Sequence, residues 1–314
     1  MTTTTRRLLG LLFGTLLSMQ AMADHYEILT GGTSGVYYPV GLALKSVLDR
    51  ELPEHTFSVV STQASVENLN LLQKGEGIIA LAQGDILSDA WEGNPEAGFP
   101  SSRTRIRLIG AAYPNFIHLL ARSDAGITSL EDLAGKRVSV GAARSGNELN
   151  ARALLGAAGL SYADLTLVEY LHYGESVELL VRGELDVVIV SAGLGVAAVT
   201  EASRRARVDL VPIAPEFIER RASMFMPGVI PAGSYPGQAE AVPTAALNNF
   251  LVTTSEAPDA LVYRITRAIF DNLESIYAAH PAAEVISREG AVATLPIDLH
   301  PGAARYFRQA GVMP

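Results

Sequence analysis

The sequence predicts an α/β fold in which two similar lobes face each other across a cleft. Short β-branched and apolar runs alternate with segments of helical periodicity, a pattern typical of helices layered on mainly parallel sheets. One strand–loop–helix pattern occurs twice, and two short segments are suited to connect one lobe with the other. Together these three observations favour a ligand-binding cleft between the lobes.

The first 23 residues have the layout of a secretory signal. Arg6 and Arg7 precede an apolar run from Leu8 to Leu17, and Ala21-Met22-Ala23 forms a small-x-small end. We therefore expect cleavage after Ala23 and a periplasmic protein, exported by the general secretory route or, given the paired arginines, by a twin-arginine route. A membrane anchor is the alternative, but the run is shorter than the ~20 residues that a spanning helix needs.

The composition narrows the function classes. The 314 residues are 48% hydrophobic, carry 24 basic and 33 acidic side chains, and include no cysteine. An acidic chain disfavours nucleic-acid binding, and the lack of cysteine excludes both a disulfide framework and thiolate chemistry. The longest apolar stretch beyond the signal, Val187 to Val199, is interrupted by Ser191 and two glycines, so we expect a buried strand followed by a turn.

Strands and helices are expected in alternation along the chain. The expected strands are Tyr26–Thr30, Phe57–Ser61, Ile78–Ala82, Ile106–Ala111, Arg137–Val140, Leu165–Val168 and Asp186–Val190. An amphipathic helix follows Pro39, and a second follows Pro258 with an apolar stripe from Leu261 to Ile276.

An internal repeat supports the two-lobe prediction. Leu71–Glu76 and Leu179–Glu184 share the pattern of two leucines, two further residues, Gly and Glu, each just before a strand. We expect Gly75 and Gly183 to end their helices in the left-handed conformation. The alternative is a coincidence of the kind that any α/β chain can produce.

The positions of the crossings set the expected domains. One crossing is expected near Pro114, between the strand 108–112 and the segment 116–121, and the return crossing within Asn248–Thr254. Lobe 1 then comprises residues 24–113 and 251–314, and lobe 2 comprises residues 114–250. Two crossings form a hinge.

The loop from Thr30 to Gly35 is the first candidate for ligand contact. It offers unobstructed backbone N–H groups, the hydroxyls of Thr33 and Ser34, and the start of the next helix, which together attract an anion. No Gly-Lys-Ser/Thr follows it, so it is not a Walker phosphate loop, and the dinucleotide glycine spacing is missing. The alternative is a simple turn with a capping hydroxyl.

A second loop of this kind lies at Gly141 to Gly146. Ser145 and Glu148 fit a reciprocal capping box at the start of a helix. Arg144, beside that helix start, either pairs with a ligand carboxylate or lies on the solvated surface.

A third group of polar residues follows two other strands. Ser65 is expected to be the N-cap of the next helix. Gln83 and Asp85 follow a strand at the edge where α/β proteins place ligand contacts, although Asp85 also suits a helix cap.

Catalytic patterns are missing from the chain. The six histidines show no metal spacing, and no Gly-x-Ser-x-Gly elbow occurs. We therefore expect neither a catalytic site nor a metal or other cofactor, although a spatially assembled exported hydrolase stays open as an alternative. We expect each histidine to be structural or exposed, unless His118, near the expected hinge, reaches the cleft.

Several motifs in order along the chain carry a resemblance to a known family. They are Thr30–Pro39 with Gly41, Ser65–Leu69, Gly135–Gly141, Ser145-Gly146, Ala192-Gly193, Ile230–Gln238 and His300–Ala303. The sequence resembles the TAXI family of solute receptors of tripartite ATP-independent periplasmic (TRAP) transporters. The resemblance implies a type II periplasmic binding protein fold, a small organic acid or amino acid such as glutamate or 2-oxoglutarate as ligand, and delivery to the TRAP membrane subunits without hydrolysis.

The resemblance also implies the contact residues. Carried over by position, the expected ligand contacts are Thr33, Ser34, Tyr37, Ser65, Asn68, Gln83, Ser145 and Gly146. The chain departs from the family pattern at Ala143-Arg144, so we add Arg144, whose cation favours a ligand with an extra carboxylate. We expect a monomer that binds no nucleic acid; a periplasmic sensor for a signalling partner is the alternative use of such a fold.

Overall fold

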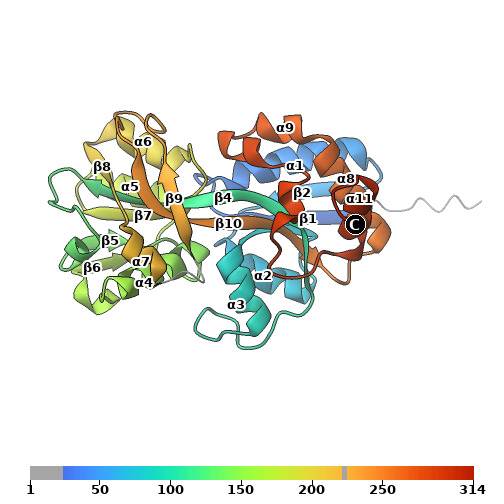
Figure 1. The fold of residues 1–314 in the computed structure, drawn as a ribbon, viewed down its shortest axis with the longest axis horizontal. Coiled ribbons are helices and arrows are strands. Elements are labelled where there is room, and N and C mark those ends of the chain that lie inside the picture. The colour runs from blue at the N-terminus through green and yellow to red at the C-terminus, as the bar shows by residue number, and fades with distance from the viewer. Residues whose placement is uncertain (1–23, 221–224) are drawn as a thin grey trace, which may run out of the picture.

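The computed structural model describes residues 24–220 and 225–314, and in it the chain forms two lobes (Figure 1). The expected signal peptide and its cleavage after Ala23 lie outside the described residues. No helix within the described part is both long enough and apolar enough to cross a bilayer.

One mixed sheet runs through both lobes, in the strand order β2-β1-β3-β10-β4-β7-β5-β6, with β8 paired to β4 and β9 to β10. The strands are β1 (His25–Leu29), β2 (Thr56–Val60), β3 (Ile79–Gln83), β4 (Ile106–Arg122), β5 (Arg137–Ser139), β6 (Leu167–Glu169), β7 (Val187–Ala192), β8 (Val208–Val211), β9 (Met226–Ile230) and β10 (Val242–Thr254). The seven expected strands are found, six of them with small shifts at their ends, whereas β4 runs on to Arg122 instead of ending at Ala111. β8, β9 and β10 were not among the predicted strands, although part of β10 was expected as a crossing.

Helices flank the sheet in each lobe (Figure 1). Those of the right-hand lobe in the figure are α1 (Tyr37–Glu51), α2 (Ser65–Lys74), α3 (Gly84–Glu92), α8 (Asp259–Asp271), α9 (Leu273–Tyr277), α10 (Gly290–Ala293) and α11 (Pro301–Gln309). Those of the other lobe are α4 (Gly146–Ala157), α5 (Tyr173–Val181), α6 (Ala197–Arg205) and α7 (Pro215–Glu219). Short 3-10 turns lie at Glu131–Leu133, Tyr162–Asp164 and Pro281–Val285.

The two lobes repeat one strand arrangement. Read from its outer edge, lobe 1 has the order β2-β1-β3-β10 and lobe 2 has β6-β5-β7-β4. The repeated glycines end equivalent helices, and Gly75 (φ 85°) and Gly183 (φ 74°) both adopt the predicted left-handed conformation.

The crossings between the lobes are two long antiparallel strands. β10 pairs with β3 in lobe 1 and with β9 in lobe 2, while β4 pairs with β10 and then with β7. Pro114, near which the first crossing was expected, lies inside β4, opposite Asn248, so the segments 108–112 and 116–121 belong to one continuous strand. A register shift between Asn248 and Phe250 accommodates a residue that lacks an N–H donor. The lobe boundaries at 113/114 and 250/251 stay a prediction.

The predicted apolar stripe from Leu261 to Ile276 is divided between two helices. Leu261, Ile265 and Ile269 are buried as expected, but α8 ends at Asp271 and a second helix carries Ile276. The helix after Pro39 also begins earlier than expected, at Tyr37. Proline is tolerated in a first helical turn, where N–H groups have no intrahelical partner.

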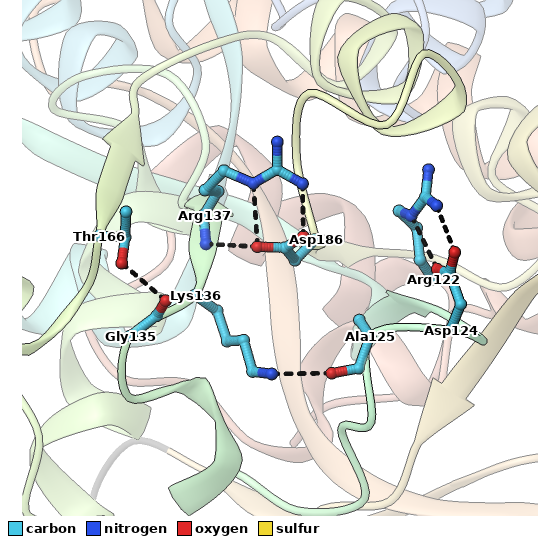
Figure 2. A network of polar contacts seen from close by, with 8 residues as sticks. All are labelled: Arg122, Asp124, Ala125, Gly135, Lys136, Arg137, Thr166 and Asp186. Atoms are coloured by element: carbon cyan, nitrogen blue, oxygen red, sulfur yellow. Dashed lines mark hydrogen bonds and ion pairs between the residues drawn. The ribbon is translucent and has the colours of Figure 1, made fainter.

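The outer end of lobe 2 is held by polar contacts (Figure 2). Asp186 accepts hydrogen bonds from the backbone N–H of Arg137 at 2.9 Å and from its guanidinium at 2.6 and 3.1 Å, and Lys136 Nζ reaches the carbonyl oxygen of Ala125 at 2.7 Å. The Arg137 guanidinium holds the pKa of Asp186 below its usual value. These contacts fix the start of β5 beside the start of β7.

Candidate functional site

A cavity of about 60 Å³ lies between the lobes, where β1, β3 and β7 end. A volume of that size accommodates several water molecules or one small solute. The lining residues come from both lobes: Gly31, Gly32, Gly35, Val36, Tyr37, Gln63, Ala64, Ser65, Gln83, Asn115, Ala142, Ser145, Gly146, Asn147, His172, Tyr173, Ser191 and Ala192. Five of the nine predicted contact residues are among them: Tyr37, Ser65, Gln83, Ser145 and Gly146.

Four helices begin at this cavity. Tyr37, Ser65, Gly146 and Tyr173 line it, and they are the first residues of α1, α2, α4 and α5. The first N–H groups of a helix have no partner within the helix, and the helix dipole places partial positive charge there. The cavity therefore favours a negatively charged group without offering a cationic side chain.

The first loop of lobe 1 contacts lobe 2 directly. A Cβ on Gly32 would lie 2.8 Å from His172 Nδ1, so with a larger residue there the His172 side chain has to move or the lobes have to separate. Ser34 Oγ accepts a hydrogen bond from the N–H of Gly174 at 2.9 Å. Ser34 therefore joins the lobes rather than lining the cavity, and Thr33 is exposed and outside it.

The equivalent loop of lobe 2 confirms half of the predicted capping box. Ser145 Oγ accepts from the N–H of Glu148 at 3.1 Å. The Glu148 carboxylate does not reciprocate, because it pairs with Arg152 at 2.6 Å and accepts from Tyr162 OH at 2.7 Å. Arg144 is exposed and lines a different groove, so the structure does not bring it to the cavity.

The prediction that Ser65 caps α2 is wrong. Ala64, with φ 72°, precedes the helix, and Ser65 is its first residue. Ser65 Oγ instead accepts from the backbone N–H of Gln83 at 3.1 Å, which joins the start of α2 to the end of β3.

Asn68 lies behind the cavity. Its side chain is fully buried, and Nδ2 donates to the carbonyl oxygens of Thr30 at 2.7 Å and Leu81 at 2.8 Å. Its Oδ1 accepts from Thr62 at 2.7 Å. These bonds fix the ends of β1 and β3, so Asn68 positions the first loop without lining the cavity.

Asn147, Tyr173, Ser191 and Asn115 line the cavity but were missed from the sequence. Asn147 Nδ2 donates to the carbonyl oxygens of Val140 at 2.7 Å and Ile189 at 2.9 Å. The position of Asn147 directly after Ser145-Gly146, at the start of the helix, could have identified it as a lining residue.

Burial keeps the tyrosines of the site neutral. Burial raises the pKa of Tyr37 and of Tyr173 well above the usual range for phenols. His118 does not reach the cavity: it bonds to the Val190 carbonyl and Tyr235 OH, and burial lowers its pKa to about 4.

Asp85 connects the lobes beside the cavity. Asn150 Nδ2, from α4, donates to Asp85 Oδ2 at 2.6 Å. Burial raises the pKa of Asp85 from 3.8 to about 7. Neither Asp85 Oδ1 nor Asn150 Oδ1 has a hydrogen-bond partner.

The lining carries no lysine, arginine, aspartate or glutamate. Among residues 24–220 and 225–314, no cluster of three or more His, Cys, Asp or Glu side chains is placed to hold a metal ion. The chemistry available at the cavity is hydrogen bonding from hydroxyls, amides and helix N-termini.

Residues 28–311 match the model of the NMT1-like family, which is nearly the whole described chain. The chain belongs to the NMT1-like family.

Solved structures similar to this NMT1-like protein include PhnD1 from Prochlorococcus marinus (MIT 9301) in complex with methylphosphonate, with a TM-score of 0.56 at 11% identity, covering 93% of this chain and 99% of that one. A periplasmic transporter gives a TM-score of 0.57 at 11% identity, covering 93% and 96%. A protein of Bordetella bronchiseptica RB50 gives 0.52 at 15% identity, covering 83% and 77%. The NMT1-like protein therefore has the predicted α/β fold of type II periplasmic binding proteins.

Proposed function

We propose that the protein is an exported receptor that captures a small carboxylate between its lobes and delivers it unchanged to a membrane transporter. The observation that carries this proposal is the convergence of four helix N-termini, two from each lobe, on one small cavity. A carboxylate bound there receives N–H donors from both lobes. It therefore favours the closed arrangement by its additional contacts in that state.

Our proposal for the transporter is a TRAP-type secondary transporter, with the protein as a TAXI receptor. The motifs at Thr30–Pro39, Ser65–Leu69 and Ser145-Gly146 support it. All three segments supply lining residues, the first two from lobe 1 and the third from lobe 2. The expected ligands are organic acids and amino acids of the glutamate and 2-oxoglutarate class, and the expected location is the periplasm.

A thermal-shift panel of organic acids and amino acids tests the binding role. A ligand that binds only the folded protein raises the melting temperature. We expect at least one small carboxylate to do so, and we expect Ser65→Ala to reduce the shift. Thr33→Ala, on the exposed part of the first loop, is the matched control and should leave the shift unchanged. A panel in which no carboxylate raises the melting temperature contradicts the proposal.

The transporter role is tested by reconstitution. We expect proteoliposomes that contain a TRAP permease encoded beside this gene to take up the acid only when the receptor and an ion gradient are both present. Uptake that requires ATP instead of the gradient would contradict the TRAP assignment and leave the binding role intact.

A further inference from the structure

The amide groups that line the cavity already donate to the protein. Gln83 Nε2 donates to Ser191 Oγ at 3.0 Å, and Asn115 Nδ2 donates to the Ser191 carbonyl at 3.0 Å. Asn147 Nδ2 donates to the carbonyls of Val140 and Ile189. Each NH₂ carries two hydrogens, so that of Asn147 is fully engaged within the protein, whereas those of Gln83 and Asn115 each keep one hydrogen that these bonds do not use.

The tyrosine hydroxyls of the lining are engaged in the same way. Tyr37 OH donates to Asn249 Oδ1 at 2.6 Å, and Tyr173 OH donates to the Ser191 carbonyl at 2.9 Å. A hydroxyl has a single hydrogen to donate. These two side chains therefore present acceptor character to the cavity.

One acceptor of the lining is left without a partner. Gln83 is 3% exposed, and its buried Oε1 has no hydrogen-bond partner among residues 24–220 and 225–314. A buried carbonyl oxygen without a donor costs about 1–3 kcal/mol, so a ligand O–H or N–H that reaches it is stabilising.

Donors for a carboxylate lie close to this acceptor. Ser65 Oγ and Ser145 Oγ each accept from a backbone N–H. The hydrogen of Ser145 is free to point elsewhere, and that of Ser65 can point either to the neighbouring Tyr37 hydroxyl or to a ligand. The point where a Gly146 Cβ would lie is 2.2 Å from Gln83 Oε1 and 3.1 Å from Ser65 Oγ. The acceptor and a carboxylate donor are thus neighbours across the start of α4, which suits a ligand whose own donor is next to its carboxylate.

A second carboxylate has no lysine or arginine to pair with. The lining holds neither within the described part of the chain, and its histidine, His172, lies against Gly32 of the first loop. The first turns of three of the four helices already contain an acid, Glu67 in α2, Glu148 in α4 and Glu175 in α5, which offsets part of the positive potential at their N-termini. Moving a second carboxylate into this cavity would remove it from water, beside these acids, without a lysine or arginine to balance its charge.

We propose that the cavity selects a monocarboxylic acid with an O–H or N–H donor on the carbon next to the carboxylate, and that Gln83 Oε1 accepts that donor. The inference rests on the proposed binding function and narrows its ligand class from organic acids and amino acids in general to monocarboxylates, away from the dicarboxylates glutamate and 2-oxoglutarate that the resemblance implies. It makes Gln83 the residue that determines specificity.

Titration calorimetry with four-carbon acids tests the proposal. Butyrate lacks the donor, 2-hydroxybutyrate and 2-aminobutyrate carry it as a hydroxyl or an ammonium, and malate and aspartate add a second carboxylate to each. We expect one donor-bearing monocarboxylate to bind at least about tenfold tighter than butyrate and than its dicarboxylate counterpart, roughly 1.4 kcal/mol. Which of the two binds tighter distinguishes the hydroxyl from the ammonium.

The outcomes separate the inference from the function. Malate or aspartate binding as tightly as its counterpart, or butyrate binding as tightly as both, overturns the inference and leaves the receptor function intact. No heat from any of these acids or from the wider panel overturns both.

Gln83→Met adds a test at the residue itself. We expect it to reduce the preference for the donor-bearing acid over butyrate to less than about threefold, because the acceptor is gone. Gln73→Met, on α2 away from the cavity, is the matched control and should keep the preference. An unchanged preference in a folded Gln83→Met protein overturns the role of Gln83; if that variant does not fold, the wild-type ratios decide.

Discussion

In each lobe one buried asparagine donates to backbone carbonyls of two neighbouring strand segments, but the two asparagines are not at equivalent positions. In lobe 1, Asn68 of α2 binds the carbonyls at the ends of β1 and β3. In lobe 2, Asn147 of α4 binds Val140, directly after β5, and Ile189 in β7. The positions are not equivalent, because α2 corresponds by the repeat to α5, where Ser176 bonds to Ser139 of β5.

The different placement means that Asn68 serves the stability of its lobe, whereas Asn147 serves both stability and the binding site. Asn68 lies behind the first loop and outside the lining, whereas Asn147 fixes two strand ends and also lines the cavity. Lobe 1 therefore supports its loop from a residue outside the lining. Lobe 2 uses a lining residue whose Oδ1 also accepts from the Ser191 N–H and the Tyr173 hydroxyl, so its loss would disturb the lining itself. Paired substitutions test this contrast.

The largest expected effect is on the two asparagines. Asn68→Ala and Asn147→Ala each leave buried carbonyls without a donor, so each should lower the free energy of unfolding by about 3 kcal/mol. Urea unfolding measures the loss. Calorimetry on the folded fraction should find ligand affinity nearly unchanged in Asn68→Ala and at least about tenfold weaker in Asn147→Ala. Equal affinities in the two variants would remove the contrast between the lobes.

Gly146→Ala tests how closely the lobes approach. The added methyl would lie 2.2 Å from Gln83 Oε1, so the Gln83 side chain has to move or the lobes have to separate. We expect about hundredfold weaker binding, roughly 2.7 kcal/mol, by calorimetry. Gly156→Ala, exposed in the same helix, is the control and should bind normally with slightly higher stability. Normal binding by Gly146→Ala would show that the lobes need not meet here.

Asp85 gives lobe closure a pH dependence. Its pKa is raised to about 7 with the lobes together, so the protonated form is favoured there, and closure becomes less favourable as pH rises from about 4 through 7. Its neighbours are Asn150 from α4, Asp89 one turn along α3, and Tyr37.

Affinity should therefore fall about tenfold between pH 5 and pH 8, measured by calorimetry. We expect Asp85→Asn to flatten this slope and Asp89→Asn to retain it. If the affinity of Asp85→Asn still falls between pH 5 and pH 8, another titrating group causes the pH dependence.

Arg144 should have the smallest effect. Its side chain is exposed and lines a separate groove, so Arg144→Ala should change affinity less than about twofold. Because Arg144 has φ 57°, Arg144→Gly should raise the free energy of unfolding by about 0.5–1 kcal/mol. A tenfold loss of affinity in Arg144→Ala would show that Arg144 contacts the ligand.

The sequence pattern was sufficient for seven of the ten strands of the described residues and for much of the cavity. Periodicity located the central strands, and Ser145 and Gly146 were identified because helix starts have a residue signature. We predicted that Arg144 contacts the ligand because it is charged. Its left-handed backbone conformation (φ 57°) and exposed side chain, which lines a separate groove, are not evident from the sequence. Tyr173 and Ser191 were missed because their place depends on how two lobes meet, which no local pattern encodes.

The most direct test is a crystal structure with the tightest-binding acid of the panel. We predict one carboxylate between the lobes, within hydrogen-bond distance of the Gly146 N–H and of the Ser65 or Ser145 hydroxyl, with contacts to both lobes. An acid bound beside Arg144, or held by one lobe alone, would contradict the account.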